Sequence, residues 1–287
     1  MRRKAGQETE LWCSQPDNLG FAHPIFSSCY LPMRETEKSV YKKVDGRAVL
    51  QMGTMPDLDD PHGTPIPLPF GSRARLLLMF AMTEAKRTRS PVVSLGSTFN
   101  EFCHSAGITP NGRNIHSIKT QLYRLANTWV RIKHPSENGL DPRQQYFLFN
   151  RVVFIQETRS DGRQLTLFPQ QMEFNHSVYK AIEETAFPFD LDAFKALKRS
   201  PRQMDLYLFL VYRLFRLSIS RQTTARIGWD GLISQFTQDG AERRSFRQKF
   251  ERDVMKVIDV AYPTARVRLD QDGLLMAPSK LAIPPSL

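Results

Sequence analysis

The hydrophobic and polar positions of this chain follow one order twice. Each copy predicts an apolar helix, a short strand, a short helix, a long basic amphipathic helix and two further strands. In the first copy these segments are residues 75–82, 92–95, 99–102, 115–129, 130–133 and 146–149. In the second copy they are residues 205–214, 225–228, 232–236, 246–261, 265–269 and 274–276. This order is typical of the winged helix, a helix-turn-helix variant, so the sequence predicts an α+β fold with tandem winged-helix domains.

Turn and cap residues support several of these elements. Asp45-Gly46 predicts a tight turn between strands at 40–44 and 47–52, and Asp272-Gly273 predicts the turn of a second-copy wing. Ser200-Pro201 predicts a helix start, because serine caps free amides and proline at the first helical position loses no hydrogen bond. Thr98 and Glu101 form a capping-box pattern, and Gly107 is placed to end that helix.

Three segments outside the repeats shape the predicted domains. Residues 1–37 show no sustained periodicity and are expected to form a partly irregular leader. Residues 55–69 contain five prolines, which predicts a linker or arm. Residues 140–180 are expected to hold extra strands at 145–156 and 164–168, then a connecting helix. We therefore expect winged-helix-like domains at 38–180 and 181–287.

The two long helices each carry one apolar stripe, which we interpret as core. The stripes are Ile115, Ile118, Leu122, Leu125, Ala126 and Trp129 in the first helix, and Phe246, Phe250, Val254, Val257, Ile258 and Ala261 in the second. The positions opposite the stripes or beside them are polar and mostly basic. They are Arg113, His116, Ser117, Thr120, Arg124 and Asn127 in the first helix, and Arg243, Arg244, Arg247, Gln248, Arg252 and Lys256 in the second.

These polar residue types suit DNA. Arginine can donate two hydrogen bonds to guanine, asparagine and glutamine can pair with adenine, and lysine, serine and threonine bind phosphate. A solvated charged face is ordinary for a single surface helix. Two such helices in matching positions of a repeat favour DNA binding, and Arg131, Lys133, Arg266 and Arg268 on the strands are secondary candidates for phosphate contact.

The charge of the chain points to the same partner. The 287 residues carry a formal net charge of +11. Residues 71–177 have 14 lysines and arginines against 7 acidic residues, residues 178–287 have 18 against 13, and residues 1–70 have 8 against 9. Because phosphate contacts release counterions, both basic repeats favour a polyanionic partner, which the predicted winged helices make double-stranded DNA.

The sequence contains no pattern of residues that is typical of an enzyme active site. The three cysteines, at 13, 29 and 103, form no zinc signature or disulfide framework, and no glycine loop of the phosphate-binding type occurs. The six histidines include no pair flanking one residue, as a metal-dependent nicking site would need, and Tyr179 and Tyr207 are expected to be core. We expect no catalysis, cofactor or metal. No apolar run approaches a membrane span, so a bacterial cytoplasmic protein is expected.

Several long segments resemble the plasmid-encoded RepA replication initiators of the iteron-binding kind. These segments are residues 69–78, 83–91, 94–102, 196–214 and 272–279, including Pro69-Phe-Gly-Ser-Arg-Ala-Arg and Ser200-Pro-Arg-Gln-Met-Asp. The resemblance runs from about Tyr30 to Ser279 and implies tandem winged helices. It also implies binding to direct repeats at a plasmid origin, help in opening the duplex, and recruitment of the host replicative helicase and initiator machinery. Such proteins often repress their own gene as well.

Two other functions fit parts of the same pattern. A transcriptional regulator could use the same folds without an initiation role, because a fold does not fix a function. A metal-dependent nicking initiator is the third reading. The extra strands of the first domain offer an edge for pairing with a second copy, so a homodimer is also expected.

Overall fold

The computed structural model describes residues 19–27, 29–45, 48–57, 60–96, 99–106, 108–109, 112–133, 143–155, 168–220, 222–238 and 242–283. The chain forms two compact units. The middle unit is Leu31–Ala186, and the composite unit joins the residues up to Tyr30 with Phe187–Leu287. The unit boundaries thus fall after residues 30 and 186, whereas the sequence placed them after residues 37 and 180.

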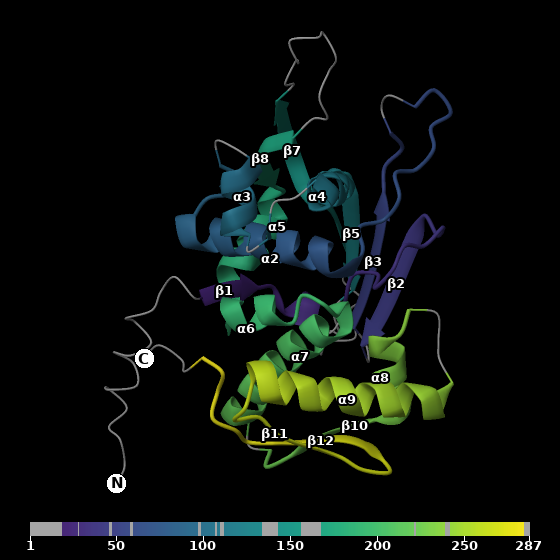
Figure 1. Ribbon diagram of the computed structural model, residues 1–287, viewed down its shortest axis with the longest axis vertical. Coiled ribbons are helices and arrows are strands. Elements are labelled where there is room, and N and C mark those ends of the chain that lie inside the picture. The colour runs from purple at the N-terminus through teal and green to yellow at the C-terminus, as the bar shows by residue number, and fades with distance from the viewer. Residues whose placement is uncertain are drawn as a thin grey trace. The chain divides into compact units, whose positions relative to one another are not determined.

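The composite unit contains the second copy of the repeat, and every predicted element of that copy is present (Figure 1). Its elements are β1 (Leu19–Ala22), η2 (Pro24–Ser27), β9 (Phe187–Asp190), α6 (Leu191–Ala196), α7 (Pro201–Ile219), β10 (Ala225–Gly228), α8 (Trp229–Phe236), α9 (Arg243–Ala261), β11 (Arg266–Leu269) and β12 (Gly273–Ala277). An antiparallel sheet has the order β10-β12-β11, and α7 and α8 contact its central strand. Helix α9 packs against α6, α7 and α8.

The predicted start of α7 is confirmed. The Ser200 hydroxyl accepts a hydrogen bond from the Gln203 amide, and Pro201 occupies the first turn. This cap determines where α7 begins. Residues Met204 to Val211 of the helix are buried, so α7 is the central helix of the core.

The leader prediction is wrong for residues 19–30. Strand β1 pairs antiparallel with β9, from Leu19 opposite Asp190 to Ala22 opposite Phe187. Beyond it, η2 contacts α7, and the ring of Tyr30 lies 5.1 Å from that of Phe236. A four-residue strand whose partner lies far along the chain leaves too little local periodicity to be detected.

The middle unit contains the first copy and several additional strands. Its elements are β2 (Val40–Asp45), β3 (Ala48–Thr54), α2 (Gly71–Thr88), β4 (Val92–Ser94), α3 (Phe99–Ser105), α4 (Gly112–Ala126), β5 (Thr128–Lys133), β6 (Arg143–Phe147), β7 (Phe149–Ile155), β8 (Phe168–Phe174) and α5 (His176–Thr185). One antiparallel sheet has the order β2-β3-β5-β6 and another has the order β4-β8-β7. The predicted hairpin of β2 and β3 is confirmed, with Asp45 opposite Ala48, and the turn itself lies outside the described residues.

The extra strands change how the first copy is connected. Strand β4 pairs with β8, whereas the matching strand of the second copy, β10, pairs with the last strand of its own repeat. Leu148 separates β6 from β7: its amide donates to the Thr128 carbonyl and its carbonyl accepts from the Asn175 amide. The chain therefore passes from one sheet to the other at this buried residue. The last added strand, β8, covers 168–174, residues 164–167 of the predicted strand lie outside the described residues, and the connecting helix is α5.

The proline-rich segment, predicted to be a linker or arm, packs in part against the middle unit. Pro56 pairs with Pro65 in an isolated bridge, and the Thr54 hydroxyl donates to the Ile66 carbonyl. The side chains of Ile66 and Leu68 are buried, so the end of this segment belongs to the core of the middle unit. Thr98 and Gly107, predicted to cap α3, lie outside the described residues. No helix in the described part of the chain is long and apolar enough to cross a membrane.

Candidate nucleic-acid interface

The buried side of α9 matches its predicted stripe. Phe246, Phe250, Val254 and Val257 are buried, and Ile258 and Ala261 are half-buried. Asp253, also on this side, accepts hydrogen bonds from Arg202 Nε at 2.5 Å and from Gln203 Nε2 at 2.8 Å. These contacts join α9 to the first turn of α7 and fix the rotation of α9 about its axis. The opposite side must therefore face outward.

The outward side of α9 presents the predicted polar residues. The exposed ones are Arg243, Arg244, Gln248, Arg252 and Lys256, and the neighbouring Lys249 is exposed as well. Arg247 is half-buried: its guanidinium lies 5.0 Å from the centre of the Trp229 ring, and its Nε lies 3.1 Å from Glu251 Oε1. Arg247 is thus held at the edge of the face, and Arg243 Nη1 lies 3.9 Å from Asp230 Oδ1.

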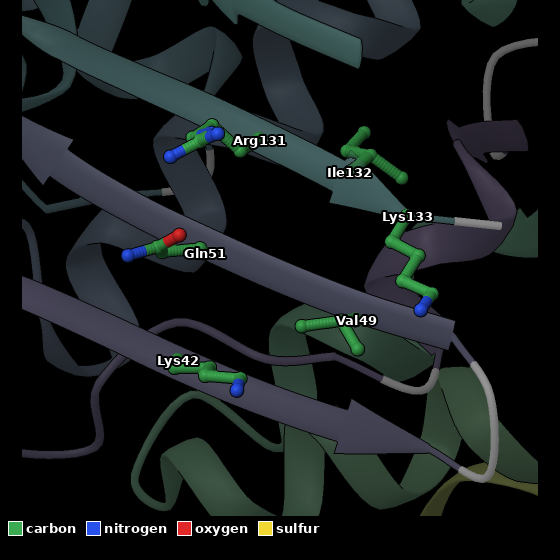
Figure 2. A pocket seen from close by; sticks show the side chains of 6 residues that line it. All are labelled: Lys42, Val49, Gln51, Arg131, Ile132 and Lys133. Carbon is green, nitrogen blue, oxygen red and sulfur yellow. The ribbon is translucent and has the colours of Figure 1, made fainter. Parts of the chain in front are cut away.

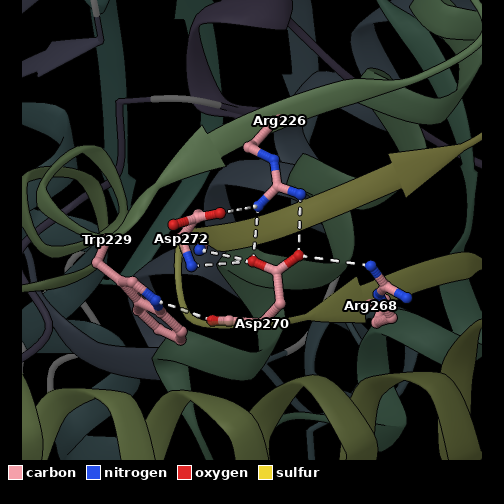
Figure 3. Close-up of polar contacts among 6 residues, drawn as sticks. Arg226, Trp229, Arg268, Asp270 and Asp272 are labelled. Carbon is pink, nitrogen blue, oxygen red and sulfur yellow. Dashed lines mark hydrogen bonds and ion pairs between the residues drawn. The ribbon is translucent and has the colours of Figure 1, made fainter.

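The tip of the β11–β12 hairpin is ordered by Asp270 (Figure 3). Its carboxylate accepts two hydrogen bonds from the guanidinium of Arg226 on β10, at 2.6 and 2.9 Å, and others from the amides of Asp272 and Gly273. The bonds from Arg226 are the main reason why the pKa of Asp270 is lowered to about 2. Arg268 Nη2 lies 3.7 Å from the same carboxylate.

Asp270 therefore organises this turn more than the predicted Asp272-Gly273 pair does. Gly273 has φ 143°, and a Cβ at this position would overlap the Ile227 carbonyl, so the turn requires glycine there. Arg266 and Arg268, the secondary candidates of the second copy, are exposed on β11.

Helix α4 exposes fewer of its predicted polar residues than the sequence predicted. His116 is exposed, and Ser117, Thr120 and Asn127 are half-buried. The Asn127 amide donates to the Tyr123 carbonyl at the end of the helix. The side chain of Arg113 lies outside the described residues.

The prediction that Arg124 faces outward is wrong. Its side chain is buried, its guanidinium donates to the Leu68 carbonyl and to Glu35 Oε1, and it lies 5.2 Å from the centre of the Phe70 ring. Gln121 is buried beside it, and its Oε1 accepts a hydrogen bond from the Phe70 amide. The chain around residues 35–70 covers this side of α4, which helical spacing alone does not reveal.

A second polar surface lies on the β2-β3-β5 part of the middle unit (Figure 2). A pocket of about 290 Å³ is lined there by Lys42, Val49, Gln51, Arg131, Ile132 and Lys133. Arg131 and Lys133 were secondary candidates in the sequence, whereas Lys42 and Gln51 were not identified. The missing information was strand register, which places Lys42, Gln51 and Arg131 in one row across three strands.

A nicking site would need metal ligands that lie together and an accessible tyrosine. No group of three or more histidine, cysteine or acidic side chains among them could hold a metal ion. Tyr179 and Tyr207 are buried, as predicted. The Tyr207 hydroxyl donates a hydrogen bond to the Asp190 carbonyl and accepts one from the Asp190 amide. Burial raises the pKa of this phenol. Neither tyrosine is placed as an accessible nucleophile.

Comparisons with known proteins give one family match and one similar fold. The family model described as plasmid-encoded RepA protein matches residues 68–231, more than half of the chain. A crystal structure of domains 2 and 3 of RctB is similar, with a TM-score of 0.58 and 15% identity, over 92% of this chain and 99% of that one. A second structure of RctB domains 2–3 has a TM-score of 0.47 and 15% identity, over 88% and 94% of the two chains. No curated protein matches the sequence.

Proposed function

Because the chain belongs to the family of plasmid-encoded RepA proteins, we propose that it initiates plasmid replication by binding repeated double-stranded sites at the origin. The observation that carries this proposal is the outward face of α9, with five exposed lysines and arginines on a helix whose other side is locked into the core. In this role the protein helps to open the duplex, recruits host replication proteins in the bacterial cytoplasm, and acts by binding rather than by catalysis.

The order of elements in the composite unit supports a winged-helix mode of binding. The order α7, β10, α8, α9, β11, β12 is that of a winged helix, with α9 in the place of the recognition helix and the Asp270 turn at the tip of the wing. In this mode Arg244, Gln248 and Arg252 reach base edges in the major groove, while Arg266 and Arg268 contact phosphates.

Binding to origin repeats tests the proposal directly. A mobility-shift titration compares duplex repeats with shuffled duplexes of the same composition over a range of salt concentrations. We expect preference for the repeats and a steep loss of affinity as salt rises. Equal affinity for shuffled DNA would contradict the proposal.

Variants locate the contact on α9. Arg244→Ala/Arg252→Ala should weaken repeat binding by about 2 kcal/mol or more and reduce the preference for the repeats over shuffled duplexes, since contacts to base edges carry the specificity. The matched control Arg199→Ala/Arg216→Ala removes two other exposed arginines of the same unit and should change affinity little. An equal loss in both variants would indicate a nonspecific charge effect.

A transcriptional regulator remains the alternative, because the same face would bind an operator. A plasmid that carries the origin but lacks the gene separates the two functions. We expect the plasmid to replicate only when the protein is supplied in trans, and repression without replication would favour the regulator. Light scattering with and without DNA tests the expected homodimer.

A further inference from the structure

We propose that the outer face of the β2-β3-β5-β6 sheet binds single-stranded DNA, which within the proposed function is a strand of the opened origin. One face of this sheet is core: Tyr41, Leu50, Met52 and Val130 are buried. The other face consists of the alternate positions, and most of its described side chains are exposed or half-buried.

Cross-strand register arranges this outer face in rows. One row is aromatic and apolar, with Val40 opposite Gly53, Gly53 opposite Trp129, and Trp129 opposite Phe147. The next row is polar and contains Lys42, Gln51, Arg131 and Gln145 in the same order of strands. A third row begins with Val44 and Val49 and continues to Lys133.

The aromatic row provides stacking surfaces. Phe147 is 46% exposed, which is unusual for a phenylalanine on a strand. Trp129 is half-buried, and its indole lies over Gly53, where a Cβ would overlap the ring. The indole can therefore lie against the backbone of β3 only because residue 53 is glycine. Bases of an unpaired strand can stack on such rings, whereas the faces of bases in a duplex are already covered.

The polar row provides the complementary charge. Lys42 and Arg131 are exposed and come from strands on either side of Gln51 (Figure 2). None of the described side chains on this face is a carboxylate, so the face is cationic throughout its described part. Cations beside aromatic rings are the combination that single-stranded nucleic acids require, since phosphates need charge and bases need a flat apolar surface.

The same charge argues against a second copy of this chain as the occupant. A twofold dimer through this face would bring Lys42 and Arg131 close to their own counterparts, with no described carboxylate on the face to neutralise them. Exposed Phe147 and Val40 would favour such a dimer, but the like charges oppose it. We therefore assign the face to a polyanion with exposed bases.

The test measures binding of the full chain to a fluorescent single strand of an AT-rich origin segment by anisotropy, with the duplex repeat measured in parallel. Phe147→Ala should weaken single-strand binding roughly tenfold, because one stacked base is lost. Lys42→Ala/Arg131→Ala should also weaken it roughly tenfold and reduce the salt slope by about 1.4, at about 0.7 per phosphate on a single strand. Phe147→Ala should bind the duplex repeat as the natural chain does.

Two controls make the result specific. Arg87→Ala/Lys180→Ala removes two exposed or half-exposed cations of the same unit away from this face and should leave single-strand binding unchanged. Arg244→Ala/Arg252→Ala should lose duplex binding and keep single-strand binding. In addition, a single strand should quench tryptophan emission in the natural chain and less so in Trp129→Phe, which retains a ring.

The outcomes separate this inference from the proposed function. Absence of single-strand binding, or unchanged binding in both sheet variants, overturns the inference while duplex binding stands. If the natural chain does not bind the duplex repeat, the proposed function is overturned instead. If Lys42→Ala/Arg131→Ala alters the oligomeric state and not the affinity for single strands, the face pairs with a second copy. Tighter binding of the same sequence as RNA would overturn the assignment to DNA.

Discussion

Truncation of Phe250 should destabilise the composite unit strongly, because this ring is the centre of an aromatic cluster. Phe250 is fully buried, and its ring centroid lies 5.2 Å from those of Phe236 and Phe246 and 6.2 Å from that of Trp229. A buried Phe→Ala change typically costs about 3–5 kcal/mol of unfolding free energy through lost burial and the cavity that remains. Each aromatic pair contributes about 0.5–1.5 kcal/mol beyond area, so loss of three pairs places Phe250→Ala in the upper half of that range.

Urea unfolding followed by tryptophan emission measures this loss, since Trp229 is buried against the same ring. Arg252→Ala is the control, because Arg252 lies two residues further along α9 and is exposed, and its change in unfolding free energy should stay within about 0.5 kcal/mol. A loss below about 1 kcal/mol for Phe250→Ala, or a larger loss for Arg252→Ala, would show that α9 is rotated from its described orientation.

Three further predictions concern other parts of the chain. The pKa of Asp270 is about 2 in the folded protein against 3.8 as a free side chain, so its contribution to stability is complete above about pH 4 and is lost as the pH falls toward 2. Asp270→Asn should remove that part of the pH dependence of the urea midpoint, and an unchanged slope would contradict the role of Arg226. Cys103 is buried with its pKa raised to about 11, so iodoacetamide at pH 8 should modify it only after unfolding, as mass spectrometry of native and urea-treated protein would show. Deletion of residues 1–30 should cost the composite unit at least about 3 kcal/mol, because β9 loses its partner strand and Phe236 loses the ring of Tyr30; equal urea midpoints for the two chains would disprove this.

The elements of the second copy could be predicted because their signals are local. The stripe of α9 repeats at helical spacing, and the hairpin that follows has its turn residues in sequence, so neighbouring positions are enough to find both. Ser200-Pro201 similarly marks the start of α7 within two residues. For these elements tertiary packing and local preference agree.

The errors share a different cause, which is contact with residues far along the chain. Arg124 has the spacing of an outward residue, yet its acceptors are the carbonyl of Leu68 and the carboxylate of Glu35. Trp129 continues the stripe of α4 at helical spacing, but Thr128 already begins β5, where pairing with β3 decides the conformation. The row of Lys42, Gln51 and Arg131 likewise exists only once the strands are paired.

The two copies of the repeat differ chemically because the middle unit contains segments that the composite unit lacks. In the middle unit the segment before α2 covers one side of α4 and takes Gln121 and Arg124 as hydrogen-bonding partners for its backbone. The same unit gains β2 and β3, which widen its sheet and create an outer face with both rings and cations. In the composite unit α9 keeps a cationic side on which no aromatic residue is exposed. A helix of that kind suits the phosphates and base edges of a closed duplex, whereas the sheet face suits unpaired bases. Exchange of α4 for the α9 sequence should therefore fail to create a second duplex-reading helix, because the residues that cover α4 would remain in place.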